Sequence, residues 1–220
     1  MEAIVCNQMN PSPNVTIIEY GMGNLWSVQS AFEYLNCSVT VTSDPETIIK
    51  SDRLVLPGVG SFRAAMEMLW MTGIAESIID SVKIRGVNIL GICLGMQLLG
   101  TGSPEDGETN GLGIVDGRTD SFDSRTANVI KVPHVGFDTV TFGEETKLFD
   151  GMSKESDFYF VHEYRMKAIR NLKTVSLCTY GEDFVAAFES KNIFATQFHP
   201  EKSQANGLRV LKNFVEIESC

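Results

Sequence analysis

The chain has 220 residues, and its 18 lysines and arginines against 28 aspartates and glutamates give a net charge of 18 − 28 = −10. This acidic balance argues against a nucleic-acid or anionic-membrane binder, because such binding needs a basic surface. No run of eighteen apolar residues occurs, so no membrane span is expected. An apolar fraction of 43% is typical of a globular protein with a sizeable core.

Residues 1–14 lack the basic start and long apolar centre of a secretory signal, and Pro11 and Pro13 disfavour a helix there. We expect a flexible N-terminal extension at 1–14, followed by one domain over 15–220. The cysteines are odd in number and scattered, which fits neither a disulfide framework nor a zinc site. A cytoplasmic protein without metal or cofactor is therefore expected. The five cysteines are Cys6, Cys37, Cys93, Cys178 and Cys220.

The first half of the chain alternates short β-branched or apolar runs with amphipathic segments. The run 87–92 is apolar except for Asn88, which is typical of a central parallel strand buried on both faces. Strands alternating with helices predict right-handed βαβ units and an α/β fold with a mainly parallel, doubly wound sheet. The predicted strands are 15–19, 38–42, 53–56 and 87–92, and the predicted helices are about 24–36, 61–71, 74–84 and 96–100.

After Thr101 the pattern changes to a strand-rich second half. A polar, glycine-rich loop is predicted at 103–110, and an amphipathic helix at about 203–217 closes the chain. No linker-like composition separates the halves, so both are assigned to one domain. The predicted strands of this half are 112–115, 129–132, 137–142, 158–161, 174–179, 184–188 and 193–198.

The segment Gly91-Ile-Cys-Leu-Gly95 follows the apolar run 87–92 and precedes a helix. This form is typical of a nucleophile elbow, whose glycines make room for a central side chain at a sharp strand-to-helix turn. The helix N-terminus favours a thiolate at Cys93, and the backbone N–H of Leu94 is placed to bond an oxyanion. The alternative is a buried cysteine in a glycine-rich βα turn.

Near the C-terminus, His199 and Glu201 flank Pro200 after another apolar run. Proline holds the preceding residue extended, and in an extended stretch side chains two apart project to the same side. Glu201 is therefore expected to orient His199, which then deprotonates Cys93. The alternative for this motif is a strand-end turn with solvated charges. Both motifs follow predicted strands, at the edge where doubly wound sheets place their sites, and jointly they favour catalysis.

The motifs Gly91-Ile-Cys-Leu-Gly-Met-Gln97 and Phe198-His-Pro-Glu-Lys-Ser203 resemble those of class I, triad-type glutamine amidotransferases. The resemblance spans about residues 15–217 and implies a single α/β domain. It also implies hydrolysis of L-glutamine to glutamate and ammonia by a triad of Cys93, His199 and Glu201. Four further stretches resemble the glutaminase subunits of imidazole glycerol phosphate synthases: Tyr20-Gly-Met-Gly-Asn24, Leu56-Pro-Gly-Val-Gly60, Pro133-His134-x-Gly136 and Tyr159-Phe-Val-His162.

The resemblance implies oxyanion donors at Leu94 and at Val59, whose flanking glycines ease a backbone flip. Taken alone, the segment 57–60 is equally a plain turn between strand and helix. Asp106 and Glu108 are rivals of Glu105 for the substrate ammonium, since they share its loop. The implied glutamine-binding residues are Gly58, Gly60, Gln97, Glu105, His162, Glu163 and Tyr164.

The resemblance further implies a heterodimer with a (β/α)8-barrel cyclase that receives the ammonia. Asn24, His134 and Lys202 are the expected partner-interface residues. For His134 a structural or interface role is expected rather than a place in the triad. Asn24 has a competing interpretation as a phosphate-binding residue at a helix N-terminus.

The chain departs from the usual family pattern at several positions. It has Pro133-His-Val-Gly-Phe-Asp138 for P-H-M-G-W-N and Phe160-Val-His-Glu-Tyr164 for F-V-H-S-Y. None of these departures touches the triad, but they leave the pathway open. Histidine biosynthesis is one reading, and a paralogue feeding a sugar amidotransferase in surface-polysaccharide or flagellar-glycan biosynthesis is the other. A non-catalytic glutaminase-like scaffold and a cysteine hydrolase of similar geometry are further alternatives.

Overall fold

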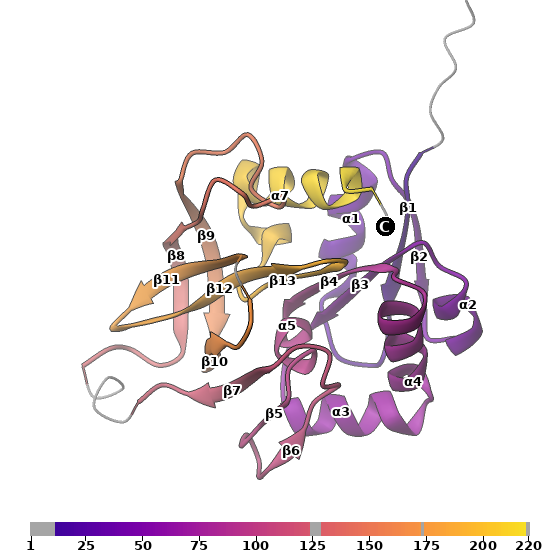
Figure 1. The fold of residues 1–220 in the computed structure, drawn as a ribbon, viewed down its shortest axis with the longest axis horizontal. Coiled ribbons are helices and arrows are strands. Elements are labelled where there is room, and N and C mark those ends of the chain that lie inside the picture. Colours follow the sequence, from indigo (N-terminus) through magenta and orange to yellow (C-terminus); the bar gives the residue numbers. More distant parts are fainter. Residues whose placement is uncertain (1–11, 124–128, 173, 219–220) are drawn as a thin grey trace, which may run out of the picture.

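The computed structural model describes residues 12–123, 129–172 and 174–218. A nine-stranded mixed sheet with the order β2-β1-β3-β4-β13-β12-β11-β8-β9 forms the centre of the molecule (Figure 1). Its first five strands pair in parallel, and the remaining pairs are antiparallel. The parallel strands are β1 Asn14–Ile18, β2 Ser38–Thr42, β3 Arg53–Gly58, β4 Asn88–Cys93 and β13 Ile193–Thr196.

The other half of the sheet consists of strands from the second half of the chain, with a small sheet of order β10-β7-β5-β6 below it in Figure 1. The strand-rich C-terminal half is thus as predicted, although the large sheet is mixed. The antiparallel strands of the large sheet are β8 His134–Thr141, β9 Glu155–His162, β11 Thr174–Tyr180 and β12 Glu182–Ser190. The small sheet contains β5 Gly102–Ser103, β6 Thr109–Asn110, β7 Gly117–Ser121 and β10 Tyr164–Ile169.

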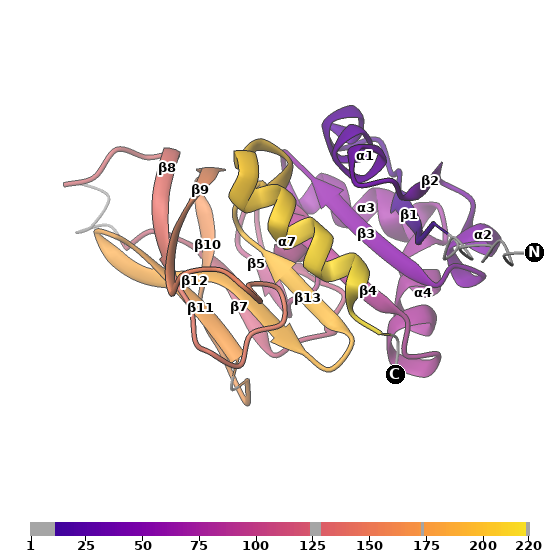
Figure 2. The ribbon, with the colours of Figure 1, turned by 90° about the horizontal axis from the view of Figure 1, so that it is seen from above.

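Helices cover both faces of the parallel half, with α1 and α7 on one side and α3, α4 and α5 on the other (Figure 1). Figure 2 shows α7 lying across β13 and β4. The helices are α1 Leu25–Tyr34, α2 Pro45–Ile49, α3 Phe62–Met71, α4 Ile74–Ile79, α5 Leu94–Leu98 and α7 Gln204–Glu216, with a π-helix at Asp80–Ile84 and a 3₁₀ turn at Pro200–Lys202.

Side chains of the central strands alternate between two hydrophobic cores. Ile17 and Leu90 pack in the core under α1 and α7, whereas Ile18 and Ile89 pack in the core under α3 and α4. All four are fully buried. The apolar run 87–92 therefore marks a strand covered on both faces, as predicted.

Two predicted strands are wrong. In the segment 112–115 the backbone N–H groups of Leu112 and Val115 donate to the carbonyls of Leu98 and Leu99, so the segment wraps the end of α5 instead of joining a ladder. The segment 129–132 forms a turn, and Val129 is 84% exposed. The apolar residues of these segments therefore did not indicate strand pairing.

The helix α2 and the four strands of the small sheet were not predicted. The helix α2 begins with Asp44, whose carboxylate accepts a hydrogen bond from the Thr47 N–H at 3.0 Å, and Pro45 occupies its first position. Both are standard helix-start signals in the sequence. Strand β10 was missed because it pairs with β7 across 43 or more residues of chain, a contact that local patterning does not reveal.

Most of the predicted flexible extension at 1–14 lies outside the described residues. The described part joins the sheet, since the Pro13 carbonyl accepts a hydrogen bond from the Ser38 N–H at 2.9 Å and β1 begins at Asn14. In the described part of the chain, no helix is long and apolar enough to cross a bilayer.

Candidate active site

Cys93 ends β4 and directly precedes α5, at the strand-to-helix turn predicted from the sequence. Its backbone is strained, with φ 53° and ψ −108°, a conformation that functional sites maintain against its cost. Gly95 makes the turn possible, because a Cβ there would lie 1.7 Å from the Leu56 carbonyl oxygen. The glycine thus lets α5 start directly against β3 and projects the Cys93 side chain at the end of the sheet.

His199 and Glu201 follow β13, the strand that pairs in parallel with β4. The Nδ1 atom of His199 lies 2.7 Å from Oε1 of Glu201, and the two side chains are 3% and 2% exposed. The His199 backbone N–H donates to the Tyr159 carbonyl on β9 at 2.9 Å. Two neighbouring strand ends and one contact with β9 therefore fix the imidazole.

The charge state of His199 follows from these surroundings. Burial disfavours its protonation, but the negative charge of Cys93 and the contacts with Cys93 and Glu201 outweigh burial and raise the pKa of His199 to about 10. The Nε2 atom is buried and makes no hydrogen bond of normal geometry. A protonated imidazole facing the thiol side is suited to hold the proton that Cys93 gives up and to deliver it to a leaving group.

Cys93 opens into a cleft of about 460 Å³. Of the predicted oxyanion and substrate residues, all but Gly58 line it. Gly58 lies beside the cleft, in register with Cys93 on the neighbouring strand β3. The lining residues are Val59, Gly60, Ser61, Cys93, Leu94, Gln97, Glu105, Pro133, Val161, His162, Glu163 and Tyr164.

Tyr20, which was assigned no role from the sequence, supports the segment 57–60, which contains the predicted oxyanion donor Val59. Its hydroxyl donates to the Pro57 carbonyl at 2.8 Å, and a Cβ at Gly58 would lie 2.2 Å from that hydroxyl oxygen. A Cβ at Gly60 would meet the Met22 methyl at 2.8 Å. The turn 20–24 therefore lies against the segment 57–60.

Gln197 is a site residue that sequence reasoning missed. Its side-chain oxygen accepts a hydrogen bond from Nε2 of Gln97 at 3.0 Å, and its own Nε2 lies 3.6 Å from the Cys93 sulfur. Nε2 of Gln97 also donates to the Tyr164 carbonyl at 2.9 Å. The spacing contained the signal: Gln197 lies two residues before His199, on the same side of an extended segment.

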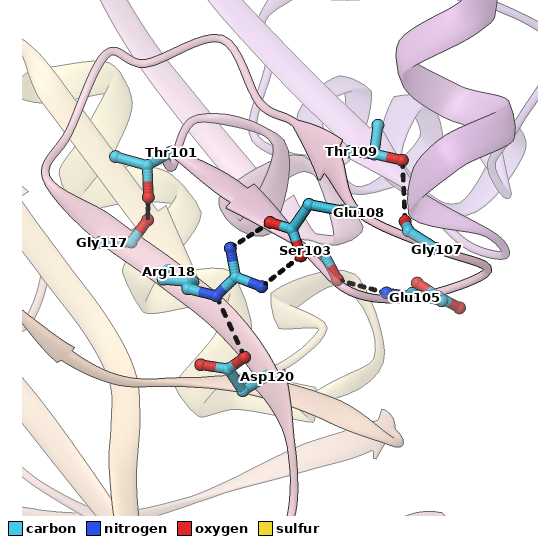
Figure 3. Close-up of polar contacts among 9 residues, drawn as sticks. All are labelled: Thr101, Ser103, Glu105, Gly107, Glu108, Thr109, Gly117, Arg118 and Asp120. Atoms are coloured by element: carbon cyan, nitrogen blue, oxygen red, sulfur yellow. Dashed lines mark hydrogen bonds and ion pairs between the residues drawn. The ribbon is translucent and has the colours of Figure 1, made fainter.

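Glu105 differs clearly from its two rivals, of which Figure 3 shows Glu108 paired with Arg118. Its carboxylate lines the cleft and accepts a hydrogen bond from the Phe62 N–H at 3.0 Å. Burial, opposed by that hydrogen bond, raises its pKa above the ordinary value. Glu108 points to Arg118 instead, in a bidentate pair with distances of 2.6 and 2.9 Å, and Asp106 accepts from the Ser61 hydroxyl at 2.8 Å. Glu105 is therefore the carboxylate available to a ligand in the cleft.

The three predicted interface residues lie in different surroundings. Asn24 is exposed and donates to the Ser27 hydroxyl at 2.7 Å, and the Lys202 ammonium lies 6.0 Å above the Tyr159 ring. Of the two roles expected for His134, its surroundings favour the structural one over the interface one: its side chain is 2% exposed and both its ring nitrogens have partners, so the imidazole does not reach the surface. Its role is internal.

Within residues 12–123, 129–172 and 174–218, no three His, Cys, Asp or Glu side chains gather to hold a metal ion. The chain matches the family "Glutamine amidotransferase class-I" over residues 16–217. It belongs to this family. As a class I glutamine amidotransferase it is an enzyme with glutaminase activity, which agrees with a nucleophile elbow that opens into a cleft.

Curated relatives narrow the assignment within the family. The imidazole glycerol phosphate synthase subunit HisH of Syntrophotalea carbinolica is 44% identical over 206 residues, which are 92% of this chain and 100% of that protein. The HisH subunit of Geobacter sulfurreducens is 42% identical over 93% of this chain and 99% of its own length. The chain therefore belongs with the HisH subunits.

Solved structures share the fold at much lower identity. A crystal structure of a glutamine amidotransferase superposes with a TM-score of 0.71 at 16% identity, covering 91% of this chain and 97% of that chain. The structure of PurLQS from Thermotoga maritima gives a TM-score of 0.69 at 19% identity, covering 92% and 97%. At this identity the likeness shows the fold alone.

Proposed function

We propose that this chain is the glutaminase subunit of an imidazole glycerol phosphate synthase, releasing ammonia from L-glutamine for histidine biosynthesis. The observation that carries the proposal is the set of Cys93, His199 and Glu201 at two adjacent strand ends, with Cys93 opening into the cleft. Relatives named as HisH subunits, similar over more than nine tenths of both chains, support the pathway.

In the proposed reaction, Cys93 sulfur attacks the carboxamide carbon of glutamine, and the backbone N–H groups of Leu94 and Val59 stabilise the oxyanion. The imidazolium of His199 then gives its proton to the leaving nitrogen, so ammonia departs and a glutamyl thioester remains. Water attacks the thioester with His199 as base, which releases glutamate and restores the thiol and imidazole pair. Glu201 holds the imidazole throughout.

Glutamine is held at its other end by residues of the cleft. Glu105 is assigned to the substrate ammonium, because it is the carboxylate of its loop that lines the cleft. The backbone around His162, Glu163 and Tyr164 is assigned to the substrate carboxylate. Gly58 and Gly60 are assigned to the site because their backbone can approach the substrate closely. Gln97 is assigned to it because its Nε2 donates to the Tyr164 carbonyl and fixes that carbonyl in place.

The partner in this proposal is a (β/α)8-barrel cyclase, bound as a heterodimer in the cytoplasm. Asn24 and Lys202 are assigned to the interface, and the chain's net charge of −10 suits a partner face with complementary basic residues. The cysteines among the described residues, Cys37, Cys93 and Cys178, are free thiols. The paralogous sugar-amidotransferase role is not favoured by the relatives.

Replacing the nucleophile tests the proposal. Cys93→Ala should lower glutamate release by at least about 10³-fold, because no other group in the cleft forms the thioester. Cys178→Ala is the matched control: that thiol is also buried, and burial raises its pKa to about 12, so it stays protonated. The control should keep its activity within about twofold. A Cys93→Ala variant as active as the control would overturn the proposal, and an inert wild type would favour a non-catalytic scaffold.

A further inference from the structure

A continuous line of hydrogen-bonding groups leads from the edge of the sheet to the glutamine cleft. Nε2 of His134 lies 3.2 Å from the Asp138 carboxylate, and its Nδ1 lies 3.0 Å from Nε2 of His162. Nδ1 of His162 lies 2.9 Å from the Tyr164 carbonyl oxygen, which also accepts from Gln97. This line from Asp138 to Tyr164 is called the histidine chain below.

Counting protons constrains the histidine chain. Its two ends, the Asp138 carboxylate and the Tyr164 carbonyl, are acceptors, so its three contacts require three protons. Two neutral imidazoles supply only two. The complete chain therefore carries a third proton, shared by His134 and Asp138 as an ion pair or as a neutral acid and base.

The surroundings keep that third proton away from His162. Burial, and after it the positive charges of His134, His199 and Arg165, lower the pKa of His162 to about 3. His162 therefore remains neutral. His134 is stacked between the rings of Tyr180 at 3.9 Å and Phe160 at 4.8 Å, which fixes its plane.

Among the described residues, few titratable groups lie near the His134 and Asp138 pair. They include His162 from β9 and Tyr180 from β11. The Cys178 thiol also lies nearby, since the charges of Asp138 and of Asp183 on β12 help to raise its pKa. Burial lowers the pKa of His134 and the Asp138 charge opposes this, so the pair loses its proton as the pH rises.

The contact that fails on deprotonation can be deduced. A single remaining proton on His134 goes to the charge-assisted bond with Asp138, which is stronger than a bond between neutral groups. His162 then has one proton for two acceptors, Nδ1 of His134 and the Tyr164 carbonyl. Because that carbonyl also accepts from Gln97, the proton goes to the contact with His134, and Nδ1 of His162 becomes an unprotonated nitrogen facing the Tyr164 carbonyl. The bond lost is thus the one nearest the cleft.

We propose that Asp138 and His134 are positioning residues for the glutamine site, acting through His162 on the Tyr164 carbonyl and coupling the pH to glutamine affinity. The inference rests on the glutamine site proposed above. The complete chain supports tight glutamine binding at low pH, and its loss at higher pH raises KM with little change in kcat.

Asp138→Asn separates this role from a structural one. The asparagine amide can donate to Nε2 of a neutral His134, so the histidine chain needs no third proton and stays complete at every pH. The lowered pKa of His134 places the loss of the proton below the ordinary histidine range. From about pH 4 to about pH 7, we therefore expect the glutamine KM of the wild type to rise about three- to tenfold relative to that of Asp138→Asn, as for one lost hydrogen bond. Asp138→Ala leaves two contacts for the two imidazole protons, so His162 can keep its bond to the Tyr164 carbonyl and the KM of this variant should also lack the rise.

Asp157→Asn is the matched control, since Asp157 is an exposed carboxylate on β9 that bonds Thr139 at 2.7 Å outside the histidine chain. Its KM profile should follow the wild type. Nitrogen NMR of the imidazoles gives a second readout: in the wild type alone, His134 and His162 should both change their protonated nitrogens over this range. Parallel KM profiles for the wild type and Asp138→Asn, with an unchanged imidazole spectrum, would overturn the inference. Absent glutamate release by the wild type would instead count against the proposed function.

Discussion

The two halves of the large sheet build the site in different ways. The parallel half supplies Cys93 and His199 from strand ends whose backbone geometry is fixed by glycine and proline. The antiparallel half supplies the opposite wall of the cleft, from Val161 to Tyr164, and holds it by side-chain contacts. The reacting groups thus depend on backbone packing, whereas the substrate wall depends on a polar network.

Buried polar groups show the same contrast. On the antiparallel side, Arg165 is 2% exposed, forms an ion pair with Glu182 and donates to the Asp120 carbonyl at 3.0 Å. The histidine chain lies nearby, above the Phe122 and Phe184 rings. In the parallel half, the strands β3 and β4 are filled almost entirely by apolar side chains. A polar network can tolerate a substitution that supplies the same number of hydrogen-bonding protons. A close backbone contact such as that of Gly95 with Leu56 tolerates no added side-chain atom.

The largest effect is expected from adding a methyl group to the elbow. Gly95→Ala would place Cβ 1.7 Å from the Leu56 carbonyl, so β3 and α5 must separate, and we expect a loss of stability above about 4 kcal/mol. Gly143→Ala, in the antiparallel half, meets nothing within 4 Å and should change stability by less than about 0.5 kcal/mol. Chemical denaturation measures both, and equal losses would remove the contrast between the halves.

A smaller effect is expected from the orienting carboxylate. Glu201→Gln should lower kcat by about 10²–10⁴-fold, because the imidazole loses its charged partner. It should also lower the pKa of His199 from about 10, which an NMR titration of the imidazole follows. Glu216→Gln, at the exposed end of α7, is the control and should leave both quantities unchanged.

The same change has a defined effect on stability. The folded-state pKa of His199 is raised, so its protonation stabilises the fold fully below about pH 6.5, and this contribution is lost as the pH rises toward 10. The difference in unfolding free energy between the wild type and Glu201→Gln should therefore shrink over that range. A difference that grows with pH would contradict the assignment.

The smallest effect concerns the carboxylates of the loop 103–110. Glu105→Gln should raise the glutamine KM about 10- to 100-fold, the range expected for one hydrogen bond to a charged group. Glu108→Gln should leave it unchanged, because that carboxylate pairs with Arg118 away from the cleft. Steady-state kinetics of the two variants distinguish them, and a larger effect at Glu108 would reverse the assignment of the ammonium site.

Reading the sequence was most successful where structure is local. The parallel strands, the helices between them apart from α2, and the two catalytic motifs occur within a few residues of their predicted places. The segment 112–115 shows the limit: its apolar residues pack in the core, but its N–H groups cap α5. Apolar content predicts burial, but it does not predict which carbonyl will accept a hydrogen bond from each backbone N–H.

The sequence by itself determined the elbow at Cys93, the pairing of His199 with Glu201 and the family. These depend on glycine, proline and side-chain periodicity, which act over a few residues. Only the tertiary structure decided that Gln197 reaches Cys93, that Glu105 rather than Glu108 enters the cleft, and that His134 lies inside the sheet. Each of these depends on which groups become neighbours after distant strands pair, and a hydrogen-bonding side chain carries no local sign of its partner.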